Sequence, residues 1–467
     1  MKITILFSSP WRFLLLIFVV FLPSIALADE VTTGHFDLKE QFVGYLSLVV
    51  TLLAYVGAMT EDVHLMKKSE PMILGSVLTW FAICIYYGLQ GHAKVASLAF
   101  ESNLLAYIEL LLFILVSMTY LNTLNERGVF DGLRIYLLNK QFSYRQLFWI
   151  TGGLAFILST IVNGLTVGLL MGSIAVAVGK RQPKFVALAC VNIVVAANAG
   201  GTMSPLGGIS TLFVWQKNIL HFTEFFSLTI PCLINFIVPA CIMHFSVPKE
   251  TPAVSQSSIA LKRGSKRIVG LFILTLIITV SSNVLLELPP AAGMMAGLAL
   301  LQMFNFYLTN TEKAGCSETE KSFDIFKSIA DVEWDTLLFF YGVMVGVGGL
   351  SFIGYLGVAS QHLYGTIDPT LANILVGIAS AFVDNGTIML SVLTMSPDIS
   401  QGQWLLVTLT AGVGGSMLAI GSAAGVGLMG QAKGIYTFTS HLKWTPVIAL
   451  GYAGSIAAHF LIYGRYF

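Results

Sequence analysis

The sequence predicts an all-helical polytopic membrane protein: an inverted structural repeat with two re-entrant helical hairpins and two broken transmembrane helices. Three observations lead to this prediction. The chain is 56% hydrophobic and only 10% charged, whereas soluble domains carry about 25% charged residues. Ten apolar stretches are long enough to cross a bilayer, which takes about 20 residues. Similar polar, glycine-rich interruptions occur in both halves of the chain.

The first residues have the form of a secretory signal. Lys2 and Arg12 accompany an apolar run over 13–22, and Ala-Leu-Ala at 26–28 has the small-x-small cleavage pattern. We predict a signal peptide over 1–28, with an uncleaved first helix as the alternative. In both cases the following chain starts outside, so we expect a periplasmic N-terminus and a location in the bacterial inner membrane.

The predicted spans form two sets, separated by a charged cytoplasmic linker over 249–267. The first repeat, 40–248, holds the spans 42–60, 71–89, 104–122, 184–213 and 225–246. The second repeat, 268–467, holds the spans 268–286, 289–308, 336–356, 403–430 and 444–464. The spans 184–213 and 403–430 contain the glycine-rich interruptions and are predicted to be the broken helices.

Two further segments, 146–180 and 370–396, each have a polar centre between two apolar arms. Basic residues flank 146–180 at both ends, so it is predicted to be a hairpin entering from the cytoplasm. If the chain is followed span by span from its outside start, 370–396 is predicted to be a hairpin entering from outside. This topology places nineteen Lys and Arg residues inside and four outside, in agreement with the positive-inside rule. Inverted repeats with broken helices are typical of secondary transporters with a binding site near the midplane.

The hairpin centres carry the first candidate residue. Asp384 begins the run Asp-Asn-Gly-Thr, and Asn163 begins Asn-Gly-Leu-Thr 221 positions earlier. A charge in hydrocarbon costs several kcal/mol, so an intramembrane Asp indicates a functional site. The alternative is that Asp384 only caps the second hairpin arm, and capping does not exclude ion binding.

The broken spans supply the other half of the predicted site. Gly-Gly-hydroxyl triplets start at Gly200 and Gly414, and glycines, with Pro205, let the backbone leave the helix. Freed carbonyls and hydroxyls suit a hard cation, whereas half-helix N-termini attract anions. We predict a cage for Na⁺, an anion or both, and Asp384 favours the cation. Because one carboxylate holds either Na⁺ or a proton, exchange would follow.

The remaining ligand candidates are polar residues at the hairpin centres and helix breaks. The asparagines have helix capping as their alternative role, and the hydroxyls have bonding to their own helix. Glu109, inside 104–122, is a secondary proton-carrier candidate, with an interfacial position as its alternative. No Lys or Arg is expected near the hairpin centres. The ligand candidates besides Asp384 are Asn163, Thr166, Asn198, Ser210, Thr211, Asn385, Ser416 and Ser422.

On these motifs the chain resembles the NhaD-type sodium/proton antiporters, within a larger group that includes arsenite permeases and dicarboxylate carriers. The likeness runs from about residue 30 to the end and is closest over 144–152, 192–211, 333–342 and 404–458. The resemblance implies Na⁺ or Li⁺ export driven by inward protons, the hairpin fold, and no cofactor. It implies ion-binding roles for Asp384, Asn385, Asn198, Ser210, Thr211, Ser416 and Ser422.

The chain departs from the family pattern at its acids. The family usually has Asp-Asn where this chain has Asn163-Gly164, and Asp where it has Gly208. The Pro that commonly follows the second Asp-Asn is replaced by Thr387. Two of three expected intramembrane acids are absent, which makes proton coupling the property to test.

The leading hypothesis is a Na⁺(Li⁺)/H⁺ antiporter. The alternatives are a carrier for a small anion or arsenite in the same fold, and a non-transporting paralogue that acts as a regulator. An enzyme is not expected, because the chain has no HExxH motif and no GxSxG motif with a placed His. The expected partners are lipid and small inorganic cations. The net charge of +1 gives no attraction to nucleic acid. A homodimer is the candidate oligomeric state.

Overall fold

The structure is a computed structural model that describes residues 36–59, 66–140, 142–179, 182–251, 262–313 and 324–464. Within these ranges the secondary structure is helical, without strands, and the helices belong to one compact unit that begins at Asp37. The predicted signal peptide over 1–28 lies outside the described residues.

Nine of the described helical segments are long and apolar enough to cross a membrane, which confirms the predicted class of fold. Each lies at a position where the sequence predicts a span. They are α2 (Phe42–Met59), α4 (Ser69–Leu89), α5 (Ala93–Glu126), α9 (Pro183–Thr202), α11 (Thr229–His244, which continues η1, Glu224–Leu228), α12 (Ser265–Leu286), α13 (Pro290–Lys313), α15 (Trp334–Phe352) and α22 (Thr445–Tyr463).

The shorter helices occupy the two hairpin segments and the two interrupted spans. Each hairpin segment contains two helices, α7 (Tyr144–Leu158) with α8 (Gly164–Val178), and α17 (Pro369–Ala379) with α18 (Asn385–Met395). After the first break α9 is followed by α10 (Ile209–Gln216), and the second break separates α19 (Gln401–Gly414) from α20 (Ala423–Gln431). The connecting helices are α6 (Val129–Asn139), α14 (Ile325–Ala330), α16 (Tyr355–Gly365) and α21 (Phe438–Leu442).

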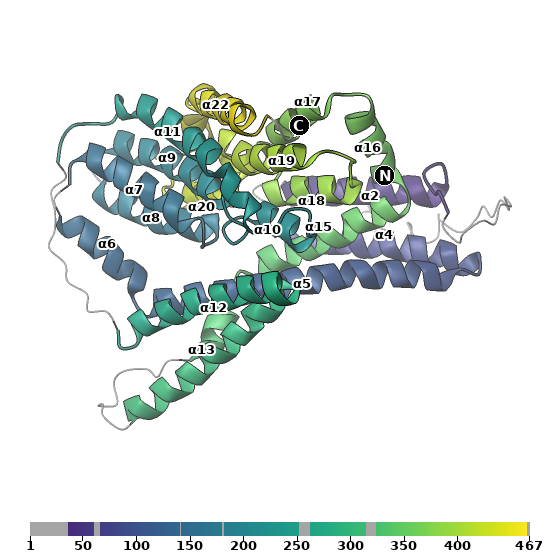
Figure 1. The fold of residues 1–467 in the computed structure, drawn as a ribbon, viewed down its shortest axis with the longest axis horizontal. Helices are drawn as coiled ribbons and strands as arrows, with labels where there is room; N and C mark the ends of the chain where they lie inside the picture. The colour runs from purple at the N-terminus through teal and green to yellow at the C-terminus, as the bar shows by residue number, and fades with distance from the viewer. Residues whose placement is uncertain are drawn as a thin grey trace, which may run out of the picture. The chain divides into compact units, whose positions relative to one another are not determined.

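Helices α9 and α19 pack against each other at the centre of the helical unit (Figure 1). Each also packs against the first arm of its hairpin, α7 on α9 and α17 on α19. The second arms cross to the other half of the chain, where α8 packs on α20 and α18 on α10. Each second arm therefore begins beside the break of one half and packs on the helix that follows the break of the other.

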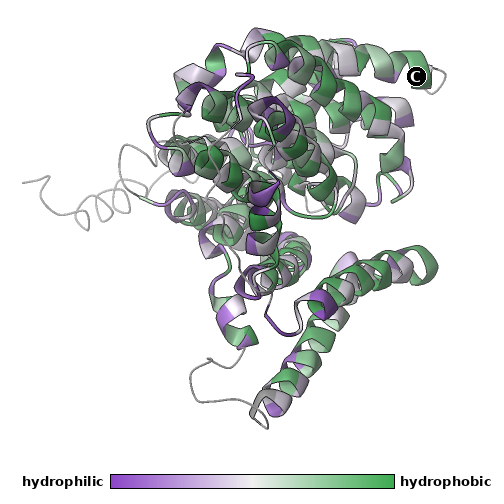
Figure 2. Ribbon diagram, turned by 90° about the vertical axis from the view of Figure 1, so that its left-hand side faces the viewer, coloured by the Kyte–Doolittle hydropathy of each residue, from purple (hydrophilic) through white to green (hydrophobic). Residues whose placement is uncertain are grey.

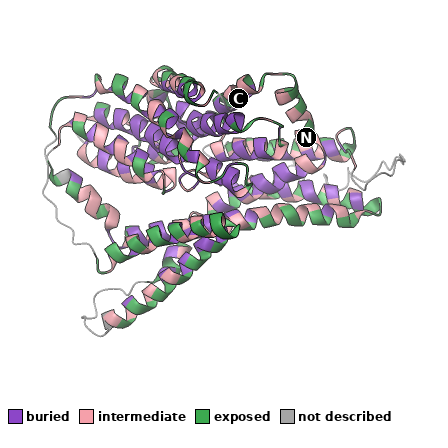
Figure 3. Ribbon diagram, in the orientation of Figure 1, coloured by how far each residue is buried: buried purple, intermediate pink, exposed green. Residues whose placement is uncertain are grey.

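Burial follows this arrangement. The apolar window of α9 is 94% buried, whereas that of α12 is 28% buried, and Figure 3 shows the same contrast between the central helices and α12 and α13. Figure 2 shows that the helices are hydrophobic over most of their length. Exposed apolar side chains such as Phe81, Leu285 and Leu461 are expected where a helix faces lipid, since its backbone is already satisfied internally.

Capping residues set the starts of the hairpin arms. Ser143 and Gln146 form a capping box at α7. Asp368 accepts hydrogen bonds from the backbone N–H groups of Thr370 and Leu371 at 2.9 and 3.3 Å, with a proline at the first helical position of α17. Both hairpins thus begin with a strong local start signal, although only the tertiary contacts bring them to the centre.

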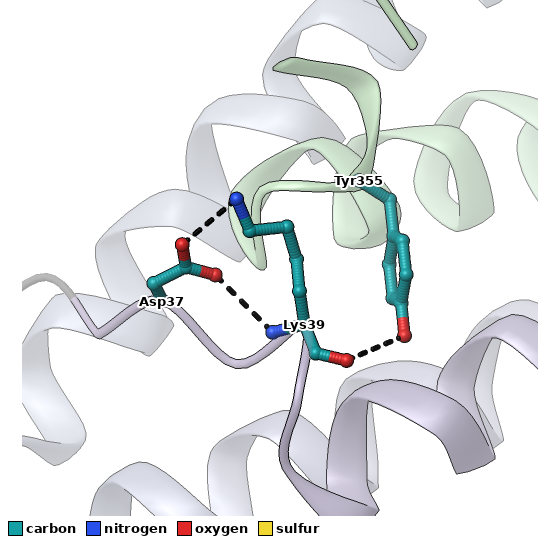
Figure 4. Close-up of polar contacts among 3 residues, drawn as sticks. All are labelled: Asp37, Lys39 and Tyr355. Atoms are coloured by element: carbon teal, nitrogen blue, oxygen red, sulfur yellow. Dashed lines mark hydrogen bonds and ion pairs between the residues drawn. The ribbon is translucent and has the colours of Figure 1, made fainter. Parts of the chain in front are cut away.

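The entry to α2 is tied to α16, the helix before the second hairpin (Figure 4). The Lys39 ammonium lies 2.8 Å from the Asp37 carboxylate, and the Tyr355 hydroxyl donates to the Lys39 carbonyl at 3.0 Å. Gly354, just before α16, has a φ of +98°, which favours glycine. An exposed ion pair contributes at most about 1 kcal/mol, so this contact chiefly sets the direction of the chain.

Two glycines allow the hairpins to approach the broken helices closely. A Cβ atom at Gly200 would lie 2.0 Å from the Phe156 carbonyl oxygen, and one at Gly414 would lie 2.0 Å from the Gly377 carbonyl oxygen. Backbone therefore meets backbone in both halves, α9 against α7 and α19 against α17. The contact sets how far each hairpin turn reaches along its broken helix.

Gly200→Ala is expected to force α7 and α9 apart and to cost about 1–3 kcal/mol, the range for overpacking a core. The melting temperature of the purified protein in detergent should fall. Gly153→Ala is the matched control, because nothing lies within 4 Å of a Cβ at that helical position. An equal melting temperature for the two variants would contradict the close-approach argument.

Candidate functional site

Asp384 is the N-cap of α18, at the turn of the second hairpin. One carboxylate oxygen, Oδ2, accepts hydrogen bonds from the backbone N–H groups of Gly386 at 3.1 Å and Thr387 at 3.4 Å. Within the described residues, the other oxygen, Oδ1, accepts no hydrogen bond, and no basic group lies within 4 Å of the carboxylate. The capping role considered from the sequence is therefore present, and it leaves one oxygen free.

The first hairpin turn has the same backbone geometry. Asn163 has φ −49° and ψ 133°, and Asp384 has φ −49° and ψ 135°. The Asn163 side chain caps α8 by accepting from the Leu165 N–H at 3.1 Å. The two turns differ in charge and not in shape, so Asn163 is a neutral counterpart of Asp384.

The hairpins meet the broken helices through matching hydrogen bonds. The Ser159 hydroxyl donates to the Ala197 carbonyl at 2.7 Å, and the Ser380 hydroxyl donates to the Ala411 carbonyl at 2.7 Å. The serines are 221 positions apart, like the hairpin turns, and the alanines are 214 apart, like the glycine triplets. All four groups are buried, so the two halves build this junction in the same way.

The first break, between α9 and α10, is held by one hydroxyl. Thr211 Oγ1 lies 2.9 Å from the carbonyl oxygens of Ser204 and Gly208, and 3.3 Å from that of Gly201. These carbonyls are freed where the helix unwinds, and Thr211 is buried among them. Its hydroxyl is thus occupied in holding the turn.

The second break, between α19 and α20, is held mainly by side chains from the loop and helix that follow it. The Ser416 hydroxyl donates to the Val413 carbonyl at 2.7 Å, within its own helix. The Ser416 carbonyl contacts His441 Nε2 at 3.0 Å, and the Met417 carbonyl accepts from the Thr445 hydroxyl at 2.7 Å. This role of His441 could not be predicted from the sequence, because its partner lies 25 positions away.

One hydrogen bond joins the two broken helices directly. Asn198 Nδ2 donates to Ser422 Oγ at 3.0 Å and to the Val194 carbonyl of its own helix at 2.9 Å. Ser422 also caps α20 by accepting from the Gly425 N–H at 3.3 Å. Both residues are at least nine-tenths buried, so this bond fixes the separation of the breaks.

Between the turns and the breaks lies a cavity of about 50 Å³. That volume has room for a few water-sized particles and is far below the roughly 300–1,000 Å³ typical of pockets for organic ligands. The helix N-termini of α8, α10, α18 and α20 all reach it. Its polar side chains include six of the predicted site residues: Asn163, Asn198, Ser210, Asp384, Asn385 and Ser422.

The other predicted site residues do not line this cavity. Thr166, Thr211 and Ser416 are absent from its wall, and the last two spend their hydroxyls on backbone carbonyls as described above. Glu109 lines a second cavity of about 50 Å³, with Gln216 and Lys217 at the far end of α10 among its neighbours. The sequence grouped these residues correctly by segment but could not show which way each side chain points.

Two residues near Asp384 were missed. Tyr55 on α2 and Lys68 before α4 both interact electrostatically with Asp384. The expectation that no Lys or Arg lies near the hairpin centres to pair with a carboxylate stays a prediction: within the described residues none lies within 4 Å of the Asp384 carboxylate, and Lys68 acts on it only through space. In the sequence, Lys68 stands at the inner end of a predicted span, where the positive-inside rule already accounts for a basic residue.

Burial controls the charge of His441, which lies on α21, the short helix between α20 and α22. It lowers the pKa of this histidine to about 4, so the ring is neutral at pH 7. Since the Ser416 carbonyl can only accept, Nε2 carries the proton, and the Tyr436 hydroxyl donates to Nδ1 at 2.7 Å. Protonation of Nδ1 would remove that acceptor and add a buried charge.

Comparisons with known proteins found relatives that match most of the chain. A family model described as a citrate transporter matches residues 9–412. The Na⁺/H⁺ antiporter NhaD of Halomonas elongata is 47% identical over 473 residues, covering 97% of this chain and 96% of the relative. NhaD of Vibrio cholerae is 48% identical over 469 residues, covering 97% and 98%. Sodium/proton antiporter 1 of Arabidopsis thaliana is 27% identical over 428 residues, covering 89% and 72%.

Among solved structures, the YdaH transporter of Alcanivorax borkumensis is similar, with a TM-score of 0.49 and 13% identity. The match covers 80% of this chain and 89% of that one.

The histidine analysis makes a pH prediction. Because folding lowers the pKa of His441 from its ordinary 6.5, the unfolded chain binds the proton first. The contribution of neutral His441 is present above pH 6.5 and lost as the pH falls toward 4. At pH 5 the loss amounts to roughly 2 kcal/mol, so acidification from pH 7 should lower the melting temperature more in the wild type than in His441→Gln. His362→Gln, at an exposed histidine, should keep the wild-type slope, and equal slopes in all three would contradict the assignment.

Proposed function

The chain belongs to the NhaD-type antiporter family, and we propose that it exchanges Na⁺ for H⁺ across the bacterial inner membrane, with Asp384 as the shared carrier. The observation that carries the proposal is the free Asp384 oxygen in a small cavity walled by oxygen donors. The named activity of the relatives, Na⁺/H⁺ antiport, supports the choice of ions.

The chemistry of the cavity favours a small, hard cation. Its polar side chains are one carboxylate, three carboxamides and three hydroxyls, the third being that of Thr202, and oxygen ligands of this kind suit hard cations. The single carboxylate matches one positive charge. Li⁺ is proposed as a second substrate because it presents the same charge and prefers the same donors.

Exchange follows from sharing one carboxylate. When Na⁺ occupies the cavity, Asp384 is ionised and its free oxygen is a ligand. When a proton occupies Asp384, the negative charge that attracts Na⁺ is absent. Transport then requires that the two loaded forms open to opposite sides while the empty, charged form does not cross the hydrocarbon.

We propose that the halves 40–248 and 268–467 form an inverted repeat, with the hairpins re-entering from opposite sides. The support is the repetition of contacts at fixed offsets, Ser159 to Ala197 and Ser380 to Ala411. In such transporters, alternating access is largely a rocking of one unit around a fixed site. The proposed entry of the first hairpin from the cytoplasm and of the second from outside follows from the periplasmic N-terminus expected from the sequence.

A carrier for a small organic anion is the second candidate, because the matching family model is described as a citrate transporter. The volume of about 50 Å³ argues against it, as does the presence of Asp384 among the lining residues. Citrate-stimulated uptake of ²²Na⁺ into vesicles would favour this candidate over exchange.

Asp384→Asn is expected to abolish exchange, because an amide neither binds a proton at neutral pH nor supplies the charge for Na⁺. In everted vesicles with a preformed ΔpH, adding Na⁺ should dissipate the gradient for the wild type only. Asp398→Asn, the same change in the exposed loop after α18, should respond like the wild type. A wild-type protein that never responds would remove the proposal, and a responsive Asp384→Asn would remove the role of Asp384.

Asn163→Asp is expected to change the coupling, since it adds a second ionisable carboxylate at a turn with the same geometry as that of Asp384. With one carboxylate we expect one proton per Na⁺ and no net charge movement. The variant should exchange more than one proton per Na⁺ and become sensitive to membrane potential. The measurement is Na⁺-driven ΔpH dissipation with and without a valinomycin-clamped potential. Potential-sensitive exchange by the wild type would contradict the one-proton scheme.

A further inference from the structure

The side chain of Lys68, the residue before α4, lies against α15. Its neighbour Ser69 is buried and donates a hydrogen bond to Asp335, which fixes the first turn of α4 beside the first turn of α15. The Lys68 ammonium lies 5.1 Å from the centre of the Phe339 ring, itself only 8% exposed. The lysine side chain therefore packs on α15 with its ammonium over an aromatic face, a favourable position for a cation.

The next residue on α15 contacts the hairpin turn. A Cβ atom at Gly386 would lie 3.3 Å from Phe340 Cε1, and the Gly386 N–H is one of the two donors to Asp384. The rings of Phe339 and Phe340 have their centres 5.6 Å apart, so these two rings lie between the Lys68 ammonium and the turn that holds the carboxylate. This geometry agrees with the electrostatic interaction between Lys68 and Asp384.

Lys68 is not committed to another partner. Glu333, just before α15, also lies in the field of the ammonium. In the part of the chain that the structure describes, no carboxylate comes within 4 Å of the Lys68 nitrogen. Lys68 is half-buried, so its charge, without a close carboxylate among the described residues, can act on the site through space.

We propose that Lys68 is a tethered cation that opposes Na⁺ at Asp384 and so sets the apparent Na⁺ affinity. It lowers the attraction of the empty site for a cation, because its charge and that of bound Na⁺ repel each other through a medium of low effective dielectric. The effect is strong here because Asn163 and Gly208 supply no negative charge to offset it. The inference rests on the proposed exchange at Asp384 and adds the residue that tunes it.

The test is the Na⁺ concentration that gives half-maximal ΔpH dissipation, measured in everted vesicles at one alkaline pH at which Asp384 is ionised, because Lys68 repels a competing proton as it repels Na⁺. Lys68→Gln and Lys68→Met both remove the charge, and the methionine keeps the apolar stem over Phe339. Both should lower the half-maximal Na⁺ concentration by about threefold to tenfold. Lys68→Arg keeps the charge and should stay near the wild type. Lys67→Gln is the matched control, because it removes a charge from the adjacent, exposed position and should have no effect.

The outcomes separate the tuning role from simpler ones. If Lys68→Gln and Lys68→Met keep the wild-type half-maximal concentration, the inference is wrong while exchange itself stands. If Lys67→Gln shifts that concentration equally, the effect is one of surface potential and the inference is again wrong. If only Lys68→Gln has an effect and Lys68→Met does not, the side chain acts by packing. A wild type without any Na⁺ response would remove the proposed function, and this inference with it.

Discussion

The structure depends on how a carboxylate is held inside an apolar protein. Asp384 Oδ2 is satisfied by two backbone N–H groups at the start of α18, whereas Oδ1 is left to the cavity. A carboxylate with both oxygens hydrogen-bonded to the protein would have no oxygen free to bind a cation. A buried carboxylate without any hydrogen bond would be too costly in free energy to keep ionised. In the proposed exchange, this half-satisfied state makes the carboxylate receptive to either a proton or Na⁺, and the other oxygen-bearing residues of the cavity wall supply further ligands.

The contacts around this carboxylate recur at the first hairpin, but its charge does not. Matching serine-to-carbonyl bonds, matching glycine approaches and matching turn geometry bring each hairpin onto its broken helix. The acids expected in the family at Asn163 and Gly208 are absent, so a symmetric frame surrounds one negative charge. With so few charges at the site, we propose that even the single positive charge of Lys68 changes its affinity for a cation.

The sequence predicted the spans, the hairpin segments and the helix breaks because hydropathy and glycine pattern report local structure directly. It also singled out Asp384, because a charge stands out in apolar sequence. It could not assign hydroxyls: Thr211 and Ser416 bond backbone carbonyls, and Ser210 and Ser422 line the cavity, a difference set by side-chain direction. Lys68 was missed since it is more than 300 positions from Asp384 and only the packing of α4 on α15 brings it near.

The most direct test of the account is proton release on ion binding by the purified protein. Na⁺ added at a pH where Asp384 is partly protonated should release protons into a weakly buffered solution, saturating with the bound Na⁺. Asp384→Asn should release none, whereas Asp398→Asn should match the wild type. Na⁺ binding without proton release, or unchanged release from Asp384→Asn, would contradict the claim that cation and proton share this carboxylate.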